Sequence, residues 1–239
     1  MDTRDQILQS VTPTVMVPRF GDFELLNHAG HRFLAAANGL WLEVWRPWLH
    51  VITPLAINNK VAMPYGQLSA TTTMLCGELP LNLMQEFSRM AKARCPQETA
   101  AWMVWNENSG QFRLVGMLNE QASEAAISFN RPRLNDNEHL VVDLHSHGCL
   151  PAFFSREDNK DDQGEIKVSL VLGNCHKEKV STAIRLCLLG KTIPLDAVVT
   201  ANGGIQLKEK TWNTSFTPRF FKARSGSWWS AQAAQEAMS

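Results

Sequence analysis

The sequence has no excess of charge of either sign. Its 23 Lys and Arg residues balance its 23 Asp and Glu residues over 239 positions, so the formal net charge at pH 7 is zero. A general electrostatic attraction to nucleic acid or to an anionic membrane is therefore disfavoured. The apolar fraction of 44% is that of an ordinary globular protein, which argues against a disordered chain.

Long hydrophobic runs and paired cysteines are also missing. Residues 1–15 show no basic segment followed by an apolar one, and nowhere do roughly 18 apolar residues follow one another, so we expect neither export nor a membrane span. The five cysteines are scattered and form no Cys-x-x-Cys pair. We therefore expect reduced thiols in a cytoplasmic protein.

Residues 1–75 predict a small β-rich N-terminal domain. Short β-branched and aromatic runs alternate with turn residues, and Asn38-Gly39 is the strongest hairpin signal. The Gly-, Ser- and Thr-rich residues 63–77 indicate a connection. Three tryptophans stand close together, and we interpret them as core or interface residues rather than as a stacking platform for a ligand: Trp41, Trp45 and Trp48.

Residues 76–210 predict an α/β domain of the α+β kind, with a mixed β-sheet and packed helices. Residues 79–94 place apolar side chains at helical spacing and are followed by Pro96, which predicts an amphipathic helix with a sharp end. Strand-like runs follow the helix, which favours a sheet with a helix packed on it. The runs are AAWMVW, QFRLVGML, AAISF, HLVVDLHSH, IKVSLVLG and STAIRLCLLG.

Residues 211–239 are interpreted as a C-terminal tail in which basic and aromatic side chains are mixed. Such a mixture can contact RNA or single-stranded DNA. We favour a tail that packs on its own domain or on a partner subunit. The residues concerned are Arg219, Phe220, Phe221, Lys222, Arg224, Trp228 and Trp229.

The strand-like run around His145 and His147 carries the most informative residues. Because side chains alternate along a strand, both imidazoles are expected on the face that points away from the core. Two imidazoles on one strand face can bind a single metal ion, although most such pairs are ordinary polar residues. The alternation assigns Val141 and Asp143 to the histidine face, and Leu140, Val142, Leu144 and Ser146 to the core face.

A helix start follows the histidines. Seven residues separate His147 from Ser155-Arg156-Glu157-Asp158, in which Ser155 has the position of an N-cap. A capped helix explains this pattern without a metal. The carboxylate of Asp158 could also point back at the strand end, as a third ligand beside His145 and His147. Two histidines and one carboxylate leave a tetrahedral position for water, whose pKa zinc lowers from 15.7 to about 7.

Hydrolysis by such a water also needs a general base, which typically contributes about 10² to 10⁴ in rate. Glu98 follows Pro96 at the predicted junction of helix and strand, from which its side chain can reach across the mouth of the sheet. Taken alone, Glu98 would be an ordinary solvated turn carboxylate. Glu107 and Glu138 are the outside candidates for the same role.

Together these residues resemble the JAMM (MPN+/JAB) metallopeptidase family. The family signature is a glutamate, then His-Ser/Thr-His, seven residues and Ser-x-x-Asp, and it matches here from the predicted helix to about residue 195. The resemblance implies an MPN/JAB-like fold and a Zn²⁺ ion. It implies that His145, His147 and Asp158 bind the zinc, that Glu98 acts as acid and base, and that Ser155 stabilises the oxyanion.

The sequence departs from the family in two places. Gly148 stands where the family usually has proline, and the polar residues 159–164 predict a helix of only a turn or two. The apolar loop 149–154 either flanks a peptide groove or, as we favour, buries Phe153 and Phe154 beneath the sheet. Cys149 lies beside the expected metal without a partner histidine, and we interpret it as a bystander.

The resemblance implies hydrolysis of a peptide or isopeptide bond. The whole chain is most similar to a protein of bacterial PRTRC cassettes, which also encode a ThiF/E1-like protein. This implies a ubiquitin-like protein or peptide as substrate and an E1/ThiF-like protein as partner. A non-catalytic MPN-type scaffold and a RadC-like DNA-associated protein are the alternatives. The complete ligand set favours the enzyme over the scaffold, and the zero net charge disfavours nucleic acid.

Overall fold

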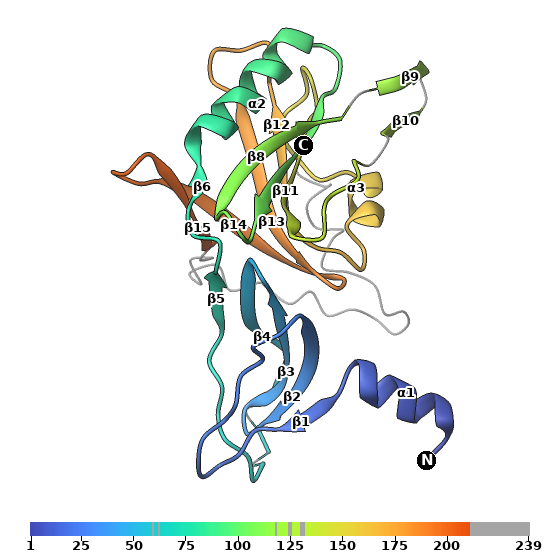
Figure 1. Ribbon diagram of the computed structural model, residues 1–239, viewed down its shortest axis with the longest axis vertical. Coiled ribbons are helices and arrows are strands. Elements are labelled where there is room, and N and C mark those ends of the chain that lie inside the picture. Colours follow the sequence, from blue (N-terminus) through green and yellow to red (C-terminus); the bar gives the residue numbers. More distant parts are fainter. Residues whose placement is uncertain (59, 62, 118, 124–125, 130–131, 211–239) are drawn as a thin grey trace, which may run out of the picture.

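The computed structural model describes residues 1–210 except 59, 62, 118, 124–125 and 130–131. Two β-sheets of unequal size follow one another along the chain (Figure 1). The predicted fold class is confirmed: a small N-terminal β-sheet domain precedes a mixed β-sheet domain with few helices. The tail predicted for residues 211–239 lies outside the described residues.

The small sheet has five strands in the order β1-β2-β3-β4-β5. The predicted hairpin is confirmed, since β2 and β3 are joined through Ala37 and Asn38. Gly39 has a φ of 135°, and a Cβ there would lie 2.0 Å from the Ala56 carbonyl oxygen, so only glycine fits. The elements are α1 (Thr3–Val11), β1 (Thr14–Met16), β2 (Gly30–Ala36), β3 (Gly39–Arg46), β4 (Leu49–Ile57) and β5 (Thr71–Met74).

The connection predicted for residues 63–77 is wrong in part. Thr71–Met74 form β5, which pairs antiparallel with β4. Threonine is β-branched and fits a pleated strand, so three consecutive threonines outweigh the turn character of the surrounding glycines and serines.

The large sheet has eight strands in the order β6-β15-β14-β13-β12-β11-β7-β8. The sheet is mixed because β11 and β12 run parallel, while the other pairs in it are antiparallel. Its strands are β6 (Leu79–Pro80), β7 (Ala100–Asn106), β8 (Gln111–Gly116), β11 (Glu138–Ser146), β12 (Ile166–Gly173), β13 (Ser181–Leu188), β14 (Lys191–Val199) and β15 (Gly204–Glu209). A separate hairpin is made by β9 (Asn119–Ser123) and β10 (Ala126–Phe129).

Two helices accompany the large sheet. The predicted amphipathic helix is α2 (Leu81–Arg94), which buries Phe87 and Ala91. The second helix, α3 (Arg156–Asp161), lies in the crossover between the parallel strands β11 and β12. Parallel strands require such a crossover, and this one starts at the carboxyl end of β11, where the histidines are. No helix among the described residues is both long and apolar enough to cross a membrane.

The two faces of the large sheet meet different partners. Val168 of β12 and Leu186 of β13 join Phe87 of α2 in the main hydrophobic cluster. Lys167 of β12 and Arg185 of β13 point the other way and contact the end of α3. Figure 1 shows α2 and α3 to either side of the sheet. Side-chain alternation thus gives one apolar face and one polar face from the same strands.

One part of the predicted alternation is wrong. The register of β11 against β7 shifts between Leu140 and Val142, so Val141 is an extra, bulged residue. As a result Val141 is fully buried in the main cluster, whereas Leu140 packs with Trp102 on the histidine face. One extra residue in a strand moves each side chain before it to the opposite face of the sheet from the one that simple alternation predicts. Downstream of the bulge the predicted alternation holds.

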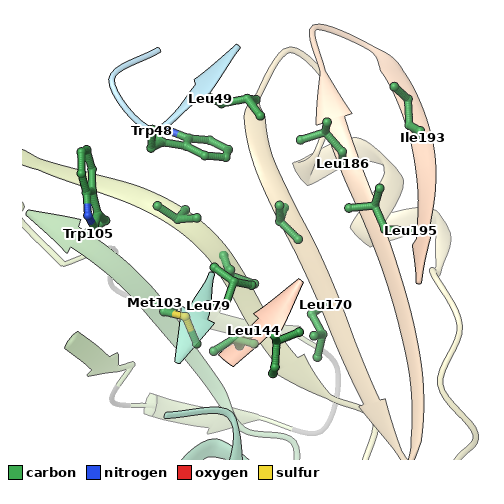
Figure 2. Packing of buried hydrophobic residues seen from close by; sticks show 14 of the residues in the cluster. Trp48, Leu49, Leu79, Met103, Trp105, Leu144, Leu170, Leu186, Ile193 and Leu195 are labelled. Atoms are coloured by element: carbon green, nitrogen blue, oxygen red, sulfur yellow. The ribbon is translucent and has the colours of Figure 1, made fainter. Parts of the chain in front are cut away.

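The two sheets share one hydrophobic core. Trp48 and Leu49, at the β3–β4 turn, belong to the same buried cluster as Leu186 and Ile193 of the large sheet. Figure 2 shows these four side chains close together. Trp48 is only 2% exposed. Of the three neighbouring tryptophans, Trp41 and Trp48 are buried and Trp45 is half-buried, which agrees with a role in core and interface.

Candidate metal centre

His145 and His147 lie at the carboxyl end of β11, where the backbone is fixed from both sides. Ser146 between them is fully buried, and its Oγ accepts a hydrogen bond from the Thr99 N–H at 2.9 Å. The Ser146 N–H donates to the Thr99 carbonyl, also at 2.9 Å, and the His147 N–H donates to the Leu172 carbonyl at 2.8 Å. The middle residue of His-Ser-His therefore anchors the backbone from which both imidazoles project, a role that sequence reasoning did not assign to it.

Asp158 reaches the histidines from the first turn of α3. The predicted capping box is present: the Ser155 Oγ accepts from the Asp158 N–H at 3.1 Å, and Asp158 Oδ2 accepts from the Ser155 N–H at 2.6 Å. The same carboxylate lies 3.1 Å from His145 Nε2 through Oδ1 and 3.7 Å from His147 Nε2 through Oδ2. The Asp158 carboxylate therefore takes part in the helix cap and also approaches both histidines, so the two interpretations of this segment are compatible.

A buried charge network holds α3 against the sheet. Asp162, directly after the helix, accepts from Arg185 Nε at 2.9 Å and Nη2 at 2.5 Å, and its Oδ1 lies 2.9 Å from Lys167 Nζ. Arg185 also donates to Asn159 Oδ1 at 2.6 Å, and Lys167 donates to Asp143 Oδ2 at 2.7 Å. Burial would raise the pKa of Asp162, but Lys167 and Arg185 outweigh burial and lower this pKa.

Sequence reasoning missed this network. Its members lie on three strands and a helix, and no local spacing connects them. The available signal was the presence of Lys167 and Arg185 inside the otherwise apolar runs IKVSLVLG and STAIRLCLLG. A charged residue in a buried strand needs a partner, so each of these side chains pointed to an unseen carboxylate.

Glu98 lies two residues before β7, next to the end of β11 that carries the histidines. β7 and β11 are antiparallel, with Ala100 opposite His145. Beyond this pair the Ser146 N–H still donates to the Thr99 carbonyl at 2.9 Å, so the backbone of Glu98, one residue before Thr99, lies near the segment that joins the two histidines. Glu98 is half-buried, and within the described part of the chain its carboxylate has no hydrogen-bond or ion-pair partner.

Glu107 and Glu138 lie at the opposite end of the same strand pair. The Glu107 carboxylate is 3.1 Å from His139 Nε2. Glu138 pairs with Arg113, which lowers the pKa of Glu138 to about 2. Glu138 begins β11 and Ser146 ends it, so at about 3.3 Å per residue these carboxylates are more than about 20 Å from the histidines. Neither is placed to serve the metal centre.

Gly148, where the family usually has proline, is required by the local geometry. Its φ is +53°, and a Cβ would lie 2.1 Å from the Pro96 carbonyl oxygen. Its own carbonyl accepts from the Cys175 N–H at 2.9 Å. Proline cannot adopt a positive φ. The glycine therefore brings the loop after the histidines into close contact with the segment that leads to Glu98.

The three predicted ligands fit a divalent metal ion. Their ligand atoms, one from each of His145, His147 and Asp158, lie within 4.8 Å of one another. His145 Nε2 and His147 Nδ1 are buried without a hydrogen bond among the described residues, so the short approach of His145 to Asp158 does not satisfy the imidazole nitrogen. Buried polar atoms are normally satisfied, and a metal ion would satisfy His145 Nε2. Two imidazoles and a carboxylate are ligands that Zn²⁺ commonly takes.

The electrostatics of Asp158 agree with this donor set. Burial would raise the pKa of Asp158, but its interactions with His145 and His147 outweigh burial and hold the pKa well below its usual range. The carboxylate is therefore ionised over the pH range in which proteins are normally stable. An ionised carboxylate is the form that binds a metal.

The favoured burial of the apolar loop is wrong for Phe153. Its side chain is 46% exposed, and its ring lies edge-on to the His147 ring with centroids 4.5 Å apart. Phe154 is half-buried instead, beneath the Arg185 guanidinium, which is 3.8 Å from the ring centroid. This cation–π contact places Phe154 beside the charge network that holds α3 against the sheet. Phe153 is left as an exposed apolar side chain beside His147.

Comparison with known proteins identifies two matches to family models. Residues 2–75 match a model described as a domain of unknown function, DUF2016, and residues 80–187 match one described as prokaryotic homologs of the JAB domain. No curated protein matches the chain. Among solved structures, the chain is similar to the solution structure of protein DSY2949 from Desulfitobacterium hafniense, at 15% identity and a TM-score of 0.35, over 55% of this chain and 88% of that one.

The match to the JAB model spans α2 through β13 and so includes the strand with both histidines, the capped helix and Glu98. Residues 80–187 are therefore similar to the prokaryotic homologs of the JAB domain, and the residues before them, 2–75, are similar to DUF2016.

Proposed function

We propose that this chain is a zinc-dependent metallopeptidase or isopeptidase that cleaves a peptide or isopeptide bond at the tail of a ubiquitin-like protein. One observation carries the proposal: one ligand atom from each of His145, His147 and Asp158 lies within 4.8 Å of the others. Glu98 precedes Thr99, whose carbonyl accepts from the Ser146 N–H between the histidines, and no described residue pairs with the Glu98 carboxylate. Members of the JAB family are often metallopeptidases. A scaffold would not need this arrangement.

The residues divide the chemistry of hydrolysis between them. A zinc ion held by His145, His147 and Asp158 would polarise the scissile carbonyl and lower the pKa of water. Glu98 takes a proton from the attacking water and returns it to the leaving amine, as a general base that then becomes a general acid. Its carboxylate is available for both steps.

Ser155 can assist without giving up its cap. Its Oγ accepts from the Asp158 N–H, which leaves the hydroxyl hydrogen free to donate. A donation to the carbonyl oxygen as negative charge develops there would stabilise the transition state. The exposed side chains of Leu150 and Phe153, 58% and 46% accessible, offer apolar contact to an extended peptide beside the histidines.

The substrate class rests on the resemblance of the whole chain to protein A of the bacterial PRTRC cassettes. Those cassettes also encode a ThiF/E1-like protein, and such proteins act on the tails of ubiquitin-like proteins. We propose a ubiquitin-like protein as substrate and an E1/ThiF-like protein as partner.

The test replaces Glu98 and follows both metal content and hydrolysis of a ubiquitin-like protein fused to a reporter. Glu98→Gln should keep its zinc and lose about 10² to 10⁴ in kcat, because the amide cannot take a proton. His147→Ala should lose both zinc and activity. Glu107→Gln, at the far end of the same strands, is the matched control and should keep both. A fully active Glu98→Gln enzyme would contradict the assignment.

The same variant identifies the substrate. Glu98→Gln keeps the binding surface and the metal ligands, so it should retain an uncleaved ubiquitin-like conjugate that mass spectrometry can identify. His147→Ala should retain less of it, because the substrate carbonyl then lacks the metal. Equal recovery with both variants would mean that retention is independent of the metal centre and would contradict the proposal.

A further inference from the structure

A second cluster of metal-binding side chains lies next to the first. Cys95 follows α2, Cys149 lies in the loop after β11, and His176 lies in the turn after β12. The sulfur atoms of Cys95 and Cys149 are 3.3 Å apart. One ligand atom from each of the three residues lies within 4.8 Å of the others. None of the three belongs to the His145 cluster.

The three segments that carry these residues are tied together by backbone hydrogen bonds. The loop of Cys149 is bonded to the turn of His176 through Cys175 N–H to Gly148 O at 2.9 Å and Asn174 N–H to Leu150 O at 2.7 Å. Helix α2 reaches the same turn, because Lys92 Nζ donates to the Glu178 carbonyl at 2.7 Å. Each ligand is thus placed by contacts that do not depend on a metal.

We propose that Cys95, Cys149 and His176 bind a second Zn²⁺ ion. Two thiolates and an imidazole are soft to borderline ligands, a set that zinc binds well and that magnesium and calcium avoid. Two thiolates also balance the charge of one Zn²⁺. Cys149 and His176 are exposed, so the ion has an entry path and the fourth position can be taken by water.

The distances suit a metal better than a disulfide. At a Zn–S length of about 2.3 Å, two sulfurs on a tetrahedral zinc are about 3.8 Å apart. The two sulfur atoms, now 3.3 Å apart, would move slightly apart to reach that value. To form a disulfide bond of about 2.05 Å they would have to approach each other by a larger amount. The sulfurs therefore lie nearer to the geometry of a shared ion.

This second ion would connect the two sides of the proposed active site. Cys95 is three residues before Glu98, and Cys149 is two residues after His147. Both segments already meet where Gly148 contacts Pro96. A zinc ion across Cys95 and Cys149 would fix the Glu98 segment relative to the histidine strand without taking part in hydrolysis.

The experiment uses the full chain with both His145→Ala and His147→Ala, which removes the first site. The buffer contains a phosphine reductant, because a thiol reductant would compete for the metal. The probe is the metal alone. This double variant should retain about one zinc per chain after dialysis. With Co²⁺ it should show a thiolate-to-cobalt charge-transfer band, which the His145 site cannot give because it has no sulfur ligand. Adding Cys149→Ser should abolish both signals, whereas Cys76→Ala, at a remote cysteine, should change neither.

A measurement in the wild-type background covers the case in which the double histidine variant does not fold. Because Cys149 is exposed, Cys149→Ser should fold and lower the zinc content from about two ions per chain to about one. Zinc content unaffected by Cys149→Ser, or the absence of the charge-transfer band, would overturn the proposal. So would a Cys95–Cys149 disulfide that forms as readily with zinc as without it. None of these outcomes depends on whether Glu98 supports hydrolysis.

Discussion

Ser155 occupies the point at which the capping of α3 meets the proposed chemistry. Its Oγ accepts from the Asp158 N–H, and its own N–H donates to the Asp158 carboxylate. One side chain thus starts the helix, orients the proposed third metal ligand and keeps a hydroxyl hydrogen for the proposed substrate. The cap and the hydroxyl donor can be separated by substitution, because aspartate caps helices but has no hydroxyl hydrogen to donate when ionised.

We therefore expect different results from two variants of Ser155. Ser155→Ala should lower the free energy of unfolding by about 1 kcal/mol, because the helix loses its cap. Ser155→Asp should keep most of this stability yet lose about 10² to 10³ in kcat, because the oxyanion loses its donor. Thermal unfolding and steady-state kinetics measure the two effects. Unchanged kcat in Ser155→Asp would show that Ser155 is only a cap.

Gly148 is a second single residue on which the site depends. Two glycines with positive φ allow its effect to be isolated: Gly148, at +53°, is crowded by Pro96, whereas Gly110, at +68°, has open space within 4 Å of the point that a Cβ would occupy. Both would be strained by a side chain, but only Gly148 would also clash.

Gly148→Ala should therefore destabilise the protein more than Gly110→Ala. We expect about 1 kcal/mol of strain at either position, and about 1–3 kcal/mol more at Gly148 from the forced displacement of the Pro96 segment. Urea unfolding measures the difference. Gly148→Ala should also weaken zinc retention, since that displacement moves the loop after His147. Equal destabilisation by the two variants would contradict the close approach.

At the scale of elements, α3 is too short to hold its own position. It has 6 residues, none of them buried, and isolated helices of this length are unstable in water. The helix is held at one end by the Ser155 cap and at the other by Asp162, which bonds to Arg185 and Lys167 on the sheet. The position of Asp158 thus depends on charges several residues away.

Replacing Asp162 should consequently disturb both stability and metal binding. Asp162→Asn leaves the buried Arg185 without its counter-charge and should lower the free energy of unfolding by about 3 kcal/mol. Asp161→Asn, one residue earlier and exposed, is the matched control and should change stability by less than about 0.5 kcal/mol. Urea unfolding and zinc retention are the measurements. A neutral Asp162→Asn would show that α3 is held by other contacts.

At the scale of the whole molecule, the two domains are packed into one structure. The cluster that contains Trp48 and Leu49 of the first domain also contains Leu186 and Ile193 of the second (Figure 2). Polar contacts cross the same boundary, with Lys191 Nζ donating to the Pro54 carbonyl and Thr72 Oγ1 donating to Glu209 Oε1 at 2.7 Å. A shared core couples the unfolding of both parts.

Trp48→Ala should therefore lower the stability of the entire described chain. Removing a fully buried tryptophan is expected to decrease the free energy of unfolding by about 3–5 kcal/mol, and the chain should still unfold in one transition. Trp45→Ala, at a half-buried position of the same sheet, should have a smaller effect. Far-ultraviolet circular dichroism in urea follows the transition. A second transition that Trp48→Ala leaves unchanged would mean that the domains unfold independently.

The features that sequence predicted are those with a local cause. Strand alternation and the Ser155 cap depend on neighbours along the chain, so β11, α2 and α3 could be predicted. The bulge at Val141 could not, because it depends on how β11 pairs with β7. β14 and β15 were missed for a related reason: Pro194 and exposed polar residues interrupt the strand pattern, and pairing with β13 decides the structure.

The residues of the candidate site likewise fall into those that a local pattern predicts and those that it does not. His145, His147, Ser155 and Asp158 follow one another closely, and their spacing already suggested a common centre. Glu98 is far from them in the chain, and only the pairing of β7 with β11 brings its segment to the end of the strand that carries the histidines. The charge network behind α3 and the Cys95–Cys149 contact join residues far apart in the chain, which no local pattern reveals.

The most direct test of the central claim is crystallographic, by anomalous diffraction measured at the zinc absorption edge on crystals of the full chain grown with zinc. We expect an anomalous peak bonded to His145 Nε2, His147 Nε2 and an Asp158 carboxylate oxygen, at lengths of about 2.0–2.2 Å. A map with no peak between these three side chains, or with a peak that the Asp158 carboxylate does not reach, would contradict it.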